Sequence, residues 1–298
     1  MAKVGFIGLG IMGKPIVMNM LKANIDVTVY DINPAVVEEC RKAGAKTAAS
    51  AKELATGKDV VMSIVPNAKI VFSLLQGDDG VLAGVHEGTV IIDMSSVTPG
   101  DSQGCAKLCA EKGCAFLDAP VSGGEEGAIK GTLSIMVGGD EQVLDSVRPV
   151  FAAIGSSAVY IGPNGSGSVT KLANQIMVNV NIAAVAEALV LAQKAGADPK
   201  RVFEAVRGGL AGSRVLEDKA PRMFNRNFVP GGSLTTNLKD ITNVMDTAKA
   251  LEVPLFLSGS VQQIMLSLKA HGHIGDDHSG MVHFYENIAG VEVHTEEK

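Results

Sequence analysis

The first half of the chain alternates short apolar runs with amphipathic stretches. The runs are mostly hydrophobic and rich in β-branched residues, which is typical of strands buried on both faces. Strands that alternate with helices in this way predict a parallel, doubly wound sheet with right-handed crossovers. The expected strands are Val4–Ile7, Val27–Tyr30, Val60–Val65, Val90–Ile92 and Ala115–Leu117, and the expected helices are Lys14–Ala23, Pro34–Ala43, Ala51–Thr56, Lys69–Leu75 and Asp101–Lys112.

The pattern changes after Ala158–Ile161. A glycine-rich loop follows, and from Ser168 to about Lys194 the chain keeps helical periodicity without a strong breaker. At ~1.5 Å per residue this helix is about 40 Å long, enough to leave one domain and enter another. We therefore expect an α/β fold, with a Rossmann domain over residues 1–163 and an all-helical domain over 164–298, joined by the long helix. Later helices are expected from Asp198-Pro199 and over Val215–Met223, Leu238–Leu251 and Ser258–His271.

Composition narrows the class of protein. Of 298 residues, 46% are hydrophobic and 19% charged, which supplies a substantial core and excludes a disordered chain. The net charge of −6 gives no electrostatic footprint for nucleic acid or anionic lipid. The best candidate for a membrane span, Ile176–Ala192, is short and contains Asn179, Asn181 and Glu187. Four cysteines without redox or zinc spacing fit a reducing compartment, so we expect a soluble, cytoplasmic protein.

A glycine motif of the form G-x-G-x-x-G directly follows the first expected strand and opens the first expected helix. In such a motif Gly8 allows a tight turn, Gly10 lets the backbone approach a pyrophosphate, and Gly13 lets helix pack on strand. The helix N-terminus adds free N–H groups and a positive dipole end. A glycine-rich turn without a ligand is the alternative, but the strand–helix context favours a dinucleotide site. Its expected members are Gly8, Leu9, Gly10, Ile11, Met12 and Gly13.

Asp31 stands at the end of the second expected strand, where an acid binds the ribose hydroxyls of a dinucleotide. Its carboxylate would repel a 2′-phosphate, and the next residue is Ile32 rather than an arginine. NAD(H) is therefore favoured as cofactor, and NADP(H) is not excluded. A capping role before Asn33-Pro34 is compatible with the same position.

Five segments together resemble the β-hydroxyacid dehydrogenase family. They follow one another in family order from the first expected strand into the helical domain, so the resemblance covers nearly the whole chain. The segments are Phe6–Gly13, Asp93–Ser96, Asp118–Gly124, Gly165–Asn174 and Lys239-Asp240. The resemblance implies a nicotinamide-dependent oxidoreductase of small β-hydroxy acids that forms a homodimer or homotetramer.

Lys171 is the expected general acid and base. Hydride transfer to a carbonyl carbon leaves negative charge on oxygen, so a proton donor must stand beside it. A lone lysine on a helix is usually solvated, but Lys171 lies in a segment that matches the family's catalytic motif. Asn174 shares its helix face at i+3 and is expected to orient the substrate. The resemblance also implies that Lys239, with Asp240 as its partner, reaches the cofactor and active site.

Ser122, Gly123 and Gly124 form a candidate site for the substrate carboxylate. Bare glycine N–H groups and one hydroxyl make an anion-binding nest, although Ser-Gly-Gly alone is usually only a loop. The resemblance implies the same role. It also places Ser96 at the nicotinamide and substrate, and the Val65-Pro66 segment along the cofactor.

The chain departs from the family pattern at three positions. Gln175 stands where the family often has a second asparagine, Gly232 stands where relatives often carry a bulky aromatic, and Arg214 adds a charge in a substrate-proximal segment. The segments Arg207–Ser213 and Lys219–Pro221 resemble those of family members that reduce tartronate semialdehyde to glycerate, so the resemblance implies this reaction. The alternatives are a 3-hydroxyisobutyrate dehydrogenase, a succinic semialdehyde-type reductase and, in another class, a non-catalytic dinucleotide sensor.

Four histidines near the end of the chain suggest a metal site at first sight. Their spacing fits no standard ligand pattern, and the family resemblance implies no metal, so we expect none. The segment Asp276–Ser279 resembles a helix start of the family, in which Asp and Ser cap the helix. The four histidines are His271, His273, His278 and His283.

Overall fold

The computed structural model describes residues 2–295 and divides into two compact units, Met1–Lys171 and Leu172–Lys298. The division falls inside one long helix, α8 (Ser166–Lys194). The expected domain boundary at residue 163, in the loop before this helix, stays a prediction.

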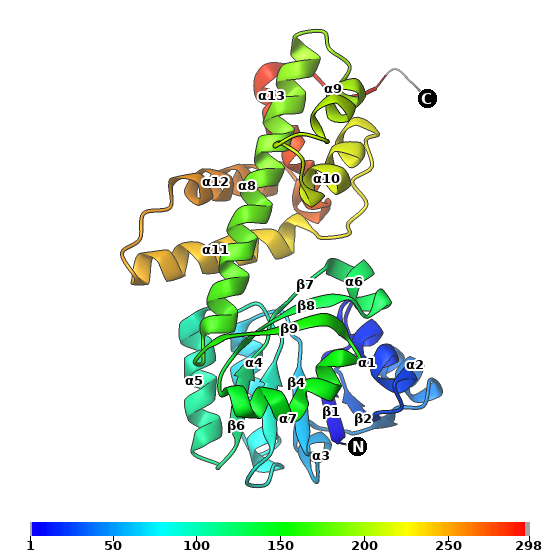
Figure 1. Ribbon diagram of the computed structural model, residues 1–298, viewed down its shortest axis with the longest axis vertical. Coiled ribbons are helices and arrows are strands. Elements are labelled where there is room, and N and C mark those ends of the chain that lie inside the picture. The colour runs from blue at the N-terminus through cyan, green and yellow to red at the C-terminus, as the bar shows by residue number, and fades with distance from the viewer. Residues whose placement is uncertain (1, 296–298) are drawn as a thin grey trace. The chain divides into compact units, whose positions relative to one another are not determined.

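The first unit is built on one sheet of nine strands (Figure 1). Its strand order is β3-β2-β1-β4-β5-β6-β8-β7, and β9 pairs with β8. The six strands β1 to β6 are mutually parallel, as expected, because a helix connects each of β1 to β5 to the next strand. The strands are β1 (Lys3–Ile7), β2 (Asp26–Tyr30), β3 (Lys46–Thr47), β4 (Val60–Ser63), β5 (Val90–Asp93), β6 (Ala115–Asp118), β7 (Val121–Ser122), β8 (Leu133–Gly138) and β9 (Gly155–Gly162).

The far end of the sheet differs from the parallel expectation. Strand β8 runs antiparallel to β6 and β7 and parallel to β9. The sequence pattern did not reveal β8 because Ser134 and Met136 alternate with fully buried Leu133, Ile135 and Val137, so the segment lacks the continuous apolar run of the first strands. The expected strand Val60–Val65 also ends earlier, at Ser63, which leaves Val65 and Pro66 in the loop after β4.

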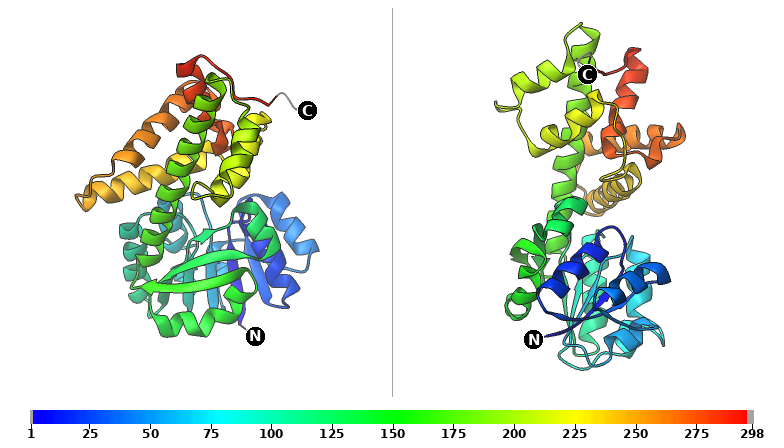
Figure 2. Two further views of the ribbon diagram at one scale, coloured as in Figure 1. Left: turned by 45° about the horizontal axis from the view of Figure 1, so that its top comes forward. Right: turned by 90° about the vertical axis from the view of Figure 1, so that its right-hand side faces the viewer.

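Helices cover both faces of the sheet and bury two apolar clusters (Figures 1 and 2). One face packs against α1, α2, α6 and α7 through residues such as Ile16, Cys40 and Phe151. The other packs against α3, α4 and α5 through residues such as Leu54 and Val71. This two-sided cover is the doubly wound arrangement that the alternating pattern predicted. The helices are α1 (Gly13–Lys22), α2 (Pro34–Lys42), α3 (Ala51–Ala55), α4 (Ala68–Leu75), η1 (Val81–Ala83), α5 (Pro99–Ala110), α6 (Gly124–Lys130) and α7 (Glu141–Ala152).

The second unit is helical, as expected (Figure 2). Its core gathers Ile182 and Leu189 of α8 with side chains from the later helices, such as Met223, Ile241 and Met265. Helix α11 begins four residues before its expected start, because Ser233 caps it by accepting the Thr236 N–H. The elements are α9 (Pro199–Val206), α10 (Arg214–Phe224), α11 (Leu234–Ala250), α12 (Phe256–Ala270), η2 (His273–Gly275), η3 (His278–Met281) and α13 (Val282–Ala289).

Helix α8 alone among the described helices is long and apolar enough to cross a membrane by length and composition, with a mean hydropathy of 1.7 over its most apolar window. Its Ile182 and Ala186 are fully buried in the core of the second unit. A core helix of a globular domain produces the same pattern, so this property carries no argument for a membrane span.

Candidate active site

The glycine motif of the first unit forms a turn with no room for side chains. A Cβ added at Gly8 would lie 2.2 Å from the carbonyl oxygen of Ile64, and one at Gly13 would lie 1.8 Å from that of Gly8. Gly10 is different, because a Cβ there would meet nothing within 4 Å. Gly8 and Gly13 are therefore required by packing, whereas Gly10 lies on an open surface that fits the approach of a pyrophosphate.

The N-terminus of α1 is not capped by a side chain, because the residue at the capping position is Met12. Ile11 is exposed over 71% of its surface and Leu9 is buried. The open N-terminus, with its positive dipole end, is suited to an anion. The residues present thus fit the phosphates of a dinucleotide.

Asp31 lies just beyond β2 and ties the glycine turn to the second strand. Its Oδ2 accepts the Leu9 N–H at 2.6 Å, and its Oδ1 accepts the Asn33 N–H at 2.8 Å. Asn33, not Asp31, caps α2, by accepting the Ala35 N–H. The carboxylate of Asp31 therefore positions the turn itself, and Leu9 contributes to the predicted site through its bond to Asp31.

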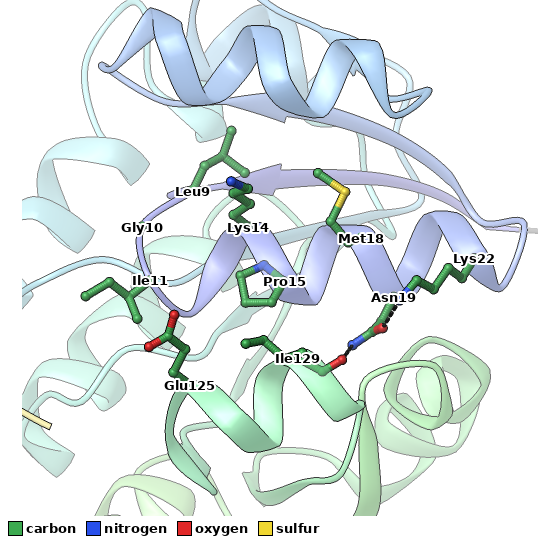
Figure 3. A pocket seen from close by; sticks show the side chains of 10 residues that line it. All are labelled: Leu9, Gly10, Ile11, Lys14, Pro15, Met18, Asn19, Lys22, Glu125 and Ile129. Atoms are coloured by element: carbon green, nitrogen blue, oxygen red, sulfur yellow. Dashed lines mark hydrogen bonds between the residues drawn. The ribbon is translucent and has the colours of Figure 1, made fainter. Parts of the chain in front are cut away.

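A cavity of about 420 Å³ adjoins the glycine turn (Figure 3). It lies between α1 and α6, and its walls include Gly10, Ile11 and Lys14 on one side and Glu125 on the other. Asn19 of α1 donates to the carbonyl oxygen of Ala128 in α6 at 2.7 Å. This bond fixes the two walls against each other, so the surface beside the cofactor turn is rigid.

The ends of β4 and β5 are joined by a buried hydrogen-bond network around Asp93. Its Oδ1 accepts the hydroxyls of Ser63 at 2.8 Å and Ser95 at 2.7 Å. Burial raises the pKa of Asp93 to about 6, although both serines donate to it. The Ser95 hydroxyl also accepts the Val65 N–H at 2.9 Å, which fixes the loop that was expected to lie along the cofactor. Val65 is half-buried there and so is Ser96, whereas Pro66 is exposed.

The Ser122–Gly124 segment lies between β7 and α6. Gly123 and Gly124 both have positive φ, 131° and 60°, which a side chain would strain. Gly123 stands at the capping position of α6 and has no side chain to bond its first-turn N–H groups. The segment lies at the same carboxyl-end edge of the sheet as Asp93, and its role as an anion-binding nest stays a prediction.

Asp118 fixes the start of α8, the helix that carries Lys171. Its two carboxylate oxygens accept the N–H groups of Gly165 at 2.8 Å and Ser168 at 2.9 Å. Burial raises the pKa of Asp118, and these bonds oppose that shift. The Ser168 hydroxyl lies 2.8 Å from that of Ser102 in α5, which adds a second attachment. Lys171, half-buried one turn further on, therefore projects from a helix end that is held firmly against the sheet.

The second unit holds a polar network around Asn174. The Asn174 amide donates to Gln175 Oε1 at 2.9 Å, and Gln175 Nε2 donates to Asp240 Oδ2 at 2.6 Å. Lys239 Nζ lies 3.1 Å from Asp240 Oδ1, which confirms the predicted pairing of these two residues. Gln175 also reaches Asn237, at 3.4 Å. Gln175, whose role the sequence left open, is thus the buried link between Asn174 and the Lys239–Asp240 pair.

The two other departures from the family pattern, Arg214 and Gly232, have different surroundings. Arg214 is exposed in the first turn of α10, which Ser213 caps by accepting the Leu216 N–H. Gly232 precedes α11, and a Cβ at this position would lie 3.4 Å from Nε2 of His278. Sequence reasoning missed this contact, because no pattern joins residues so far apart.

Three side chains near the C-terminal end come together although their spacing did not indicate it. Ligand atoms of His273, Asp276 and His283 lie within 4.8 Å of one another. Nδ1 of His273 is bonded to Asp276 and Nδ1 of His283 to Glu286, each at 2.9 Å. The absence of a metal stays a prediction. Asp277 caps η3 as expected, by accepting the Ser279 N–H.

Comparison with known families covers both units. The model for the NAD binding domain of 6-phosphogluconate dehydrogenase matches residues 3–162. The model for the NAD-binding domain of NADP-dependent 3-hydroxyisobutyrate dehydrogenase matches residues 165–285. The chain belongs to the β-hydroxyacid dehydrogenase family, as its five motifs indicated. It is accordingly an oxidoreductase with a nicotinamide dinucleotide as its cofactor.

Individual relatives cover almost the whole chain. It is 42% identical over 287 residues to 2-hydroxy-3-oxopropionate reductase of Escherichia coli (strain K12), covering 96% of this chain and 98% of that protein. It is 37% identical to 2-(hydroxymethyl)glutarate dehydrogenase of Eubacterium barkeri, covering 98% and 97%. Among solved structures, Mycobacterium tuberculosis 3-hydroxyisobutyrate dehydrogenase with L-serine matches with a TM-score of 0.89 and 30% identity, covering 96% and 99%.

Proposed function

We propose that this protein reduces tartronate semialdehyde (2-hydroxy-3-oxopropionate) to glycerate with NADH, and catalyses the reverse reaction with NAD⁺. The observation that carries the proposal is the 42% identity to a 2-hydroxy-3-oxopropionate reductase along 96% of the chain. Lys171 and Asn174, on one face of α8, supply the groups that such a reaction needs.

A nicotinamide dinucleotide held by the glycine turn and Asp31 would supply the hydride to the carbonyl carbon, or accept it from the alcohol. In the reductive direction Lys171 Nζ gives a proton to the carbonyl oxygen, and in the oxidative direction it takes that proton back. The Asn174 amide orients the reacting oxygen, and the bond from its Nδ2 to Gln175 fixes the plane of that amide. Lys239, paired with Asp240, adds positive charge toward the cofactor.

The Ser122–Gly124 nest binds the substrate carboxylate, and Ser96 lies at the nicotinamide and substrate. The two successive glycines carry no side chain that would cover their N–H groups, and the Ser122 hydroxyl adds a donor. A carboxylate held there leaves the other end of a three-carbon acid for the chemistry at Lys171. The cofactor is held by the glycine turn from Gly8 to Gly13 and by Asp31.

NADH is the proposed cofactor rather than NADPH. The carboxylate of Asp31, held in place by Leu9 and Asn33, would repel a 2′-phosphate. We further propose domains over residues 1–163 and 164–298, a homodimer or homotetramer, and a cytoplasmic location without nucleic-acid or membrane partners. Exposed Leu210 and Phe256 on the second unit support self-association.

A substrate screen tests the proposal. The purified protein is assayed at 340 nm with NADH and NADPH against tartronate semialdehyde, methylmalonate semialdehyde and succinic semialdehyde. The highest kcat/KM is expected for tartronate semialdehyde with NADH. A higher kcat/KM for another semialdehyde would transfer the assignment to a 3-hydroxyisobutyrate dehydrogenase or a succinic semialdehyde reductase. Cofactor binding without turnover of any of them would identify a dinucleotide sensor instead.

A further inference from the structure

His278 is a buried histidine whose ring is not satisfied by the protein. Only 9% of its surface is exposed, and Nδ1 is fully buried without a hydrogen-bond partner in the described chain. Nε2 faces Gly232 and likewise receives no hydrogen bond from residues 2–295. Buried polar groups are normally paired, so a ring left with two open nitrogens points to a partner that binds from outside the chain.

The surroundings keep this imidazole neutral. The pKa of His278 is lowered to about 4, because burial and the cations Lys219 and Arg222 outweigh the opposing charges of Asp277 and Asp218. At neutral pH the ring therefore carries one N–H donor and one acceptor nitrogen. A hydroxyl group can donate to Nε2 or accept from it, whichever tautomer is present, whereas a methyl group of similar size can do neither.

The ring is held in a fixed place relative to Gly232. The His278 N–H donates to the Gly232 carbonyl oxygen at 2.9 Å. The adjacent Asp277 accepts the N–H groups of Gly231 at 3.0 Å and Gly232 at 3.1 Å, and pairs with Lys219 at 3.2 Å. The two segments are thus clamped together, which fixes the backbone from which the imidazole projects beside Gly232.

Gly232 leaves that edge uncovered. A Cβ at this position would lie 3.4 Å from Nε2 and 3.5 Å from Cε1 of His278, so any larger side chain would cover the ring. The backbone does not require glycine here, because Gly232 lies outside the left-handed region where side chains are strained. The glycine therefore serves access to the imidazole rather than the turn.

The uncovered edge is connected to the proposed substrate-orienting amide. The same Cβ position lies 3.8 Å from the Asn237 amide nitrogen, Asn237 is bonded to Gln175, and Gln175 is bonded to Asn174. All these residues belong to the second unit. A series of short contacts thus links the imidazole to Asn174.

We infer that Nε2 of His278 binds the hydroxyl group on C2 of the substrate and thereby selects hydroxylated acids over their methyl analogues. This inference rests on the proposed function and names the residue that sets its substrate preference. Substrates of the proposed reaction share the form HOCH₂–CHR–COO⁻. Glycerate has R = OH and 3-hydroxyisobutyrate has R = CH₃, two groups of nearly equal size that differ in hydrogen bonding.

The test compares oxidation of D-glycerate and 3-hydroxyisobutyrate with NAD⁺ by the full-length wild-type protein, His278→Phe and His278→Gln. The ratio of kcat/KM for glycerate to that for 3-hydroxyisobutyrate is expected to fall at least about 10-fold in His278→Phe, because the hydroxyl loses its partner. His278→Gln, which keeps a polar terminus, should restore part of the ratio. Turnover of 3-hydroxyisobutyrate reports folding in each variant.

Two further variants make the result specific. Gly232→Val covers the ring without changing it and should lower the same ratio, whereas His271→Phe, at the exposed end of α12, should leave it unchanged. A ratio that stays at the wild-type value in both His278→Phe and Gly232→Val, or equal losses for both substrates, would overturn the inference and leave the proposed function intact. A wild-type protein that does not oxidise glycerate would instead overturn the proposed function.

Discussion

Two substitutions of Asp31 distinguish the effect of its negative charge from the effect of its hydrogen bond to the Leu9 N–H. In Asp31→Ala the glycine turn loses the charge-assisted bond from the Leu9 N–H, whose length is 2.6 Å, and such bonds contribute about 1.5–3 kcal/mol. In Asp31→Asn one amide oxygen can still accept that N–H, while the negative charge is gone. Both variants remove the repulsion of a 2′-phosphate, but only the alanine variant loosens the turn.

The change in cofactor preference follows from the charge. Two unit charges at contact distance interact by about 1 kcal/mol in water and about 4 kcal/mol near a protein surface. The ratio of kcat/KM for NADPH to that for NADH should therefore rise at least about 10-fold in both variants, since each 1.4 kcal/mol corresponds to a factor of ten. Asp31→Ala should also show a weaker overall affinity for NADH than Asp31→Asn.

The assay is steady-state kinetics at 340 nm with each coenzyme at fixed substrate, together with NADH binding followed by fluorescence. Asp26→Asn is the matched control, because Asp26 begins the same strand at its opposite end and pairs with Lys46 at the surface. A wild-type protein that prefers NADPH, or a preference unchanged in both Asp31 variants, would refute the reasoning.

Three other properties follow from the same structure. Gly13→Ala places a Cβ 1.8 Å from the carbonyl oxygen of Gly8 and should lower the free energy of unfolding, measured in urea, by about 1–3 kcal/mol or more. Gly10→Ala should keep the wild-type stability and weaken NADH binding. Equal stabilities of the two variants would contradict this prediction. All four thiols are buried, and burial raises the pKa of Cys105 to about 12, so dithionitrobenzoate at pH 8 should label the folded protein slowly and the denatured protein at once. The pKa of His278 falls from 6.5 to about 4 on folding, so between these pH values the unfolded state binds a proton that the folded state does not. The free energy of unfolding of the wild type should therefore drop by about 3 kcal/mol between pH 6.5 and pH 4 relative to that of His278→Gln. The same pH dependence of stability in both proteins would contradict this prediction.

The fold and the cofactor site of the first unit could be predicted from the sequence, because the patterns that indicate them are local. The glycine motif, the strand before it and Asp31 lie within one strand–helix–strand unit, and each follows a pattern with a direct physical cause. The carboxyl ends of β4, β5 and β6 then follow from parallel pairing. The exception is β8, where an alternating pattern and an antiparallel partner replace the buried parallel run.

The helices of the second unit could be predicted from the sequence, but the contacts that bring its polar residues together could not. Asp240 pairs with Gln175 across 65 positions, and His278 meets Gly232 through a close backbone contact. Contacts of this kind depend on how helices pack, and helical periodicity says only which face is apolar. For the same reason the spacing of His273, Asp276 and His283 gave no indication that they lie together.

The central claim is that Lys171 transfers the proton during hydride transfer. The direct test is the turnover of Lys171→Ala, measured beside NADH binding and beside Lys194→Ala at the far end of the same helix. We predict that kcat falls at least ~10²-fold in Lys171→Ala while NADH binds as in the wild type, and that Lys194→Ala keeps its activity. A Lys171→Ala protein that turns over its substrate at the wild-type rate would contradict the account.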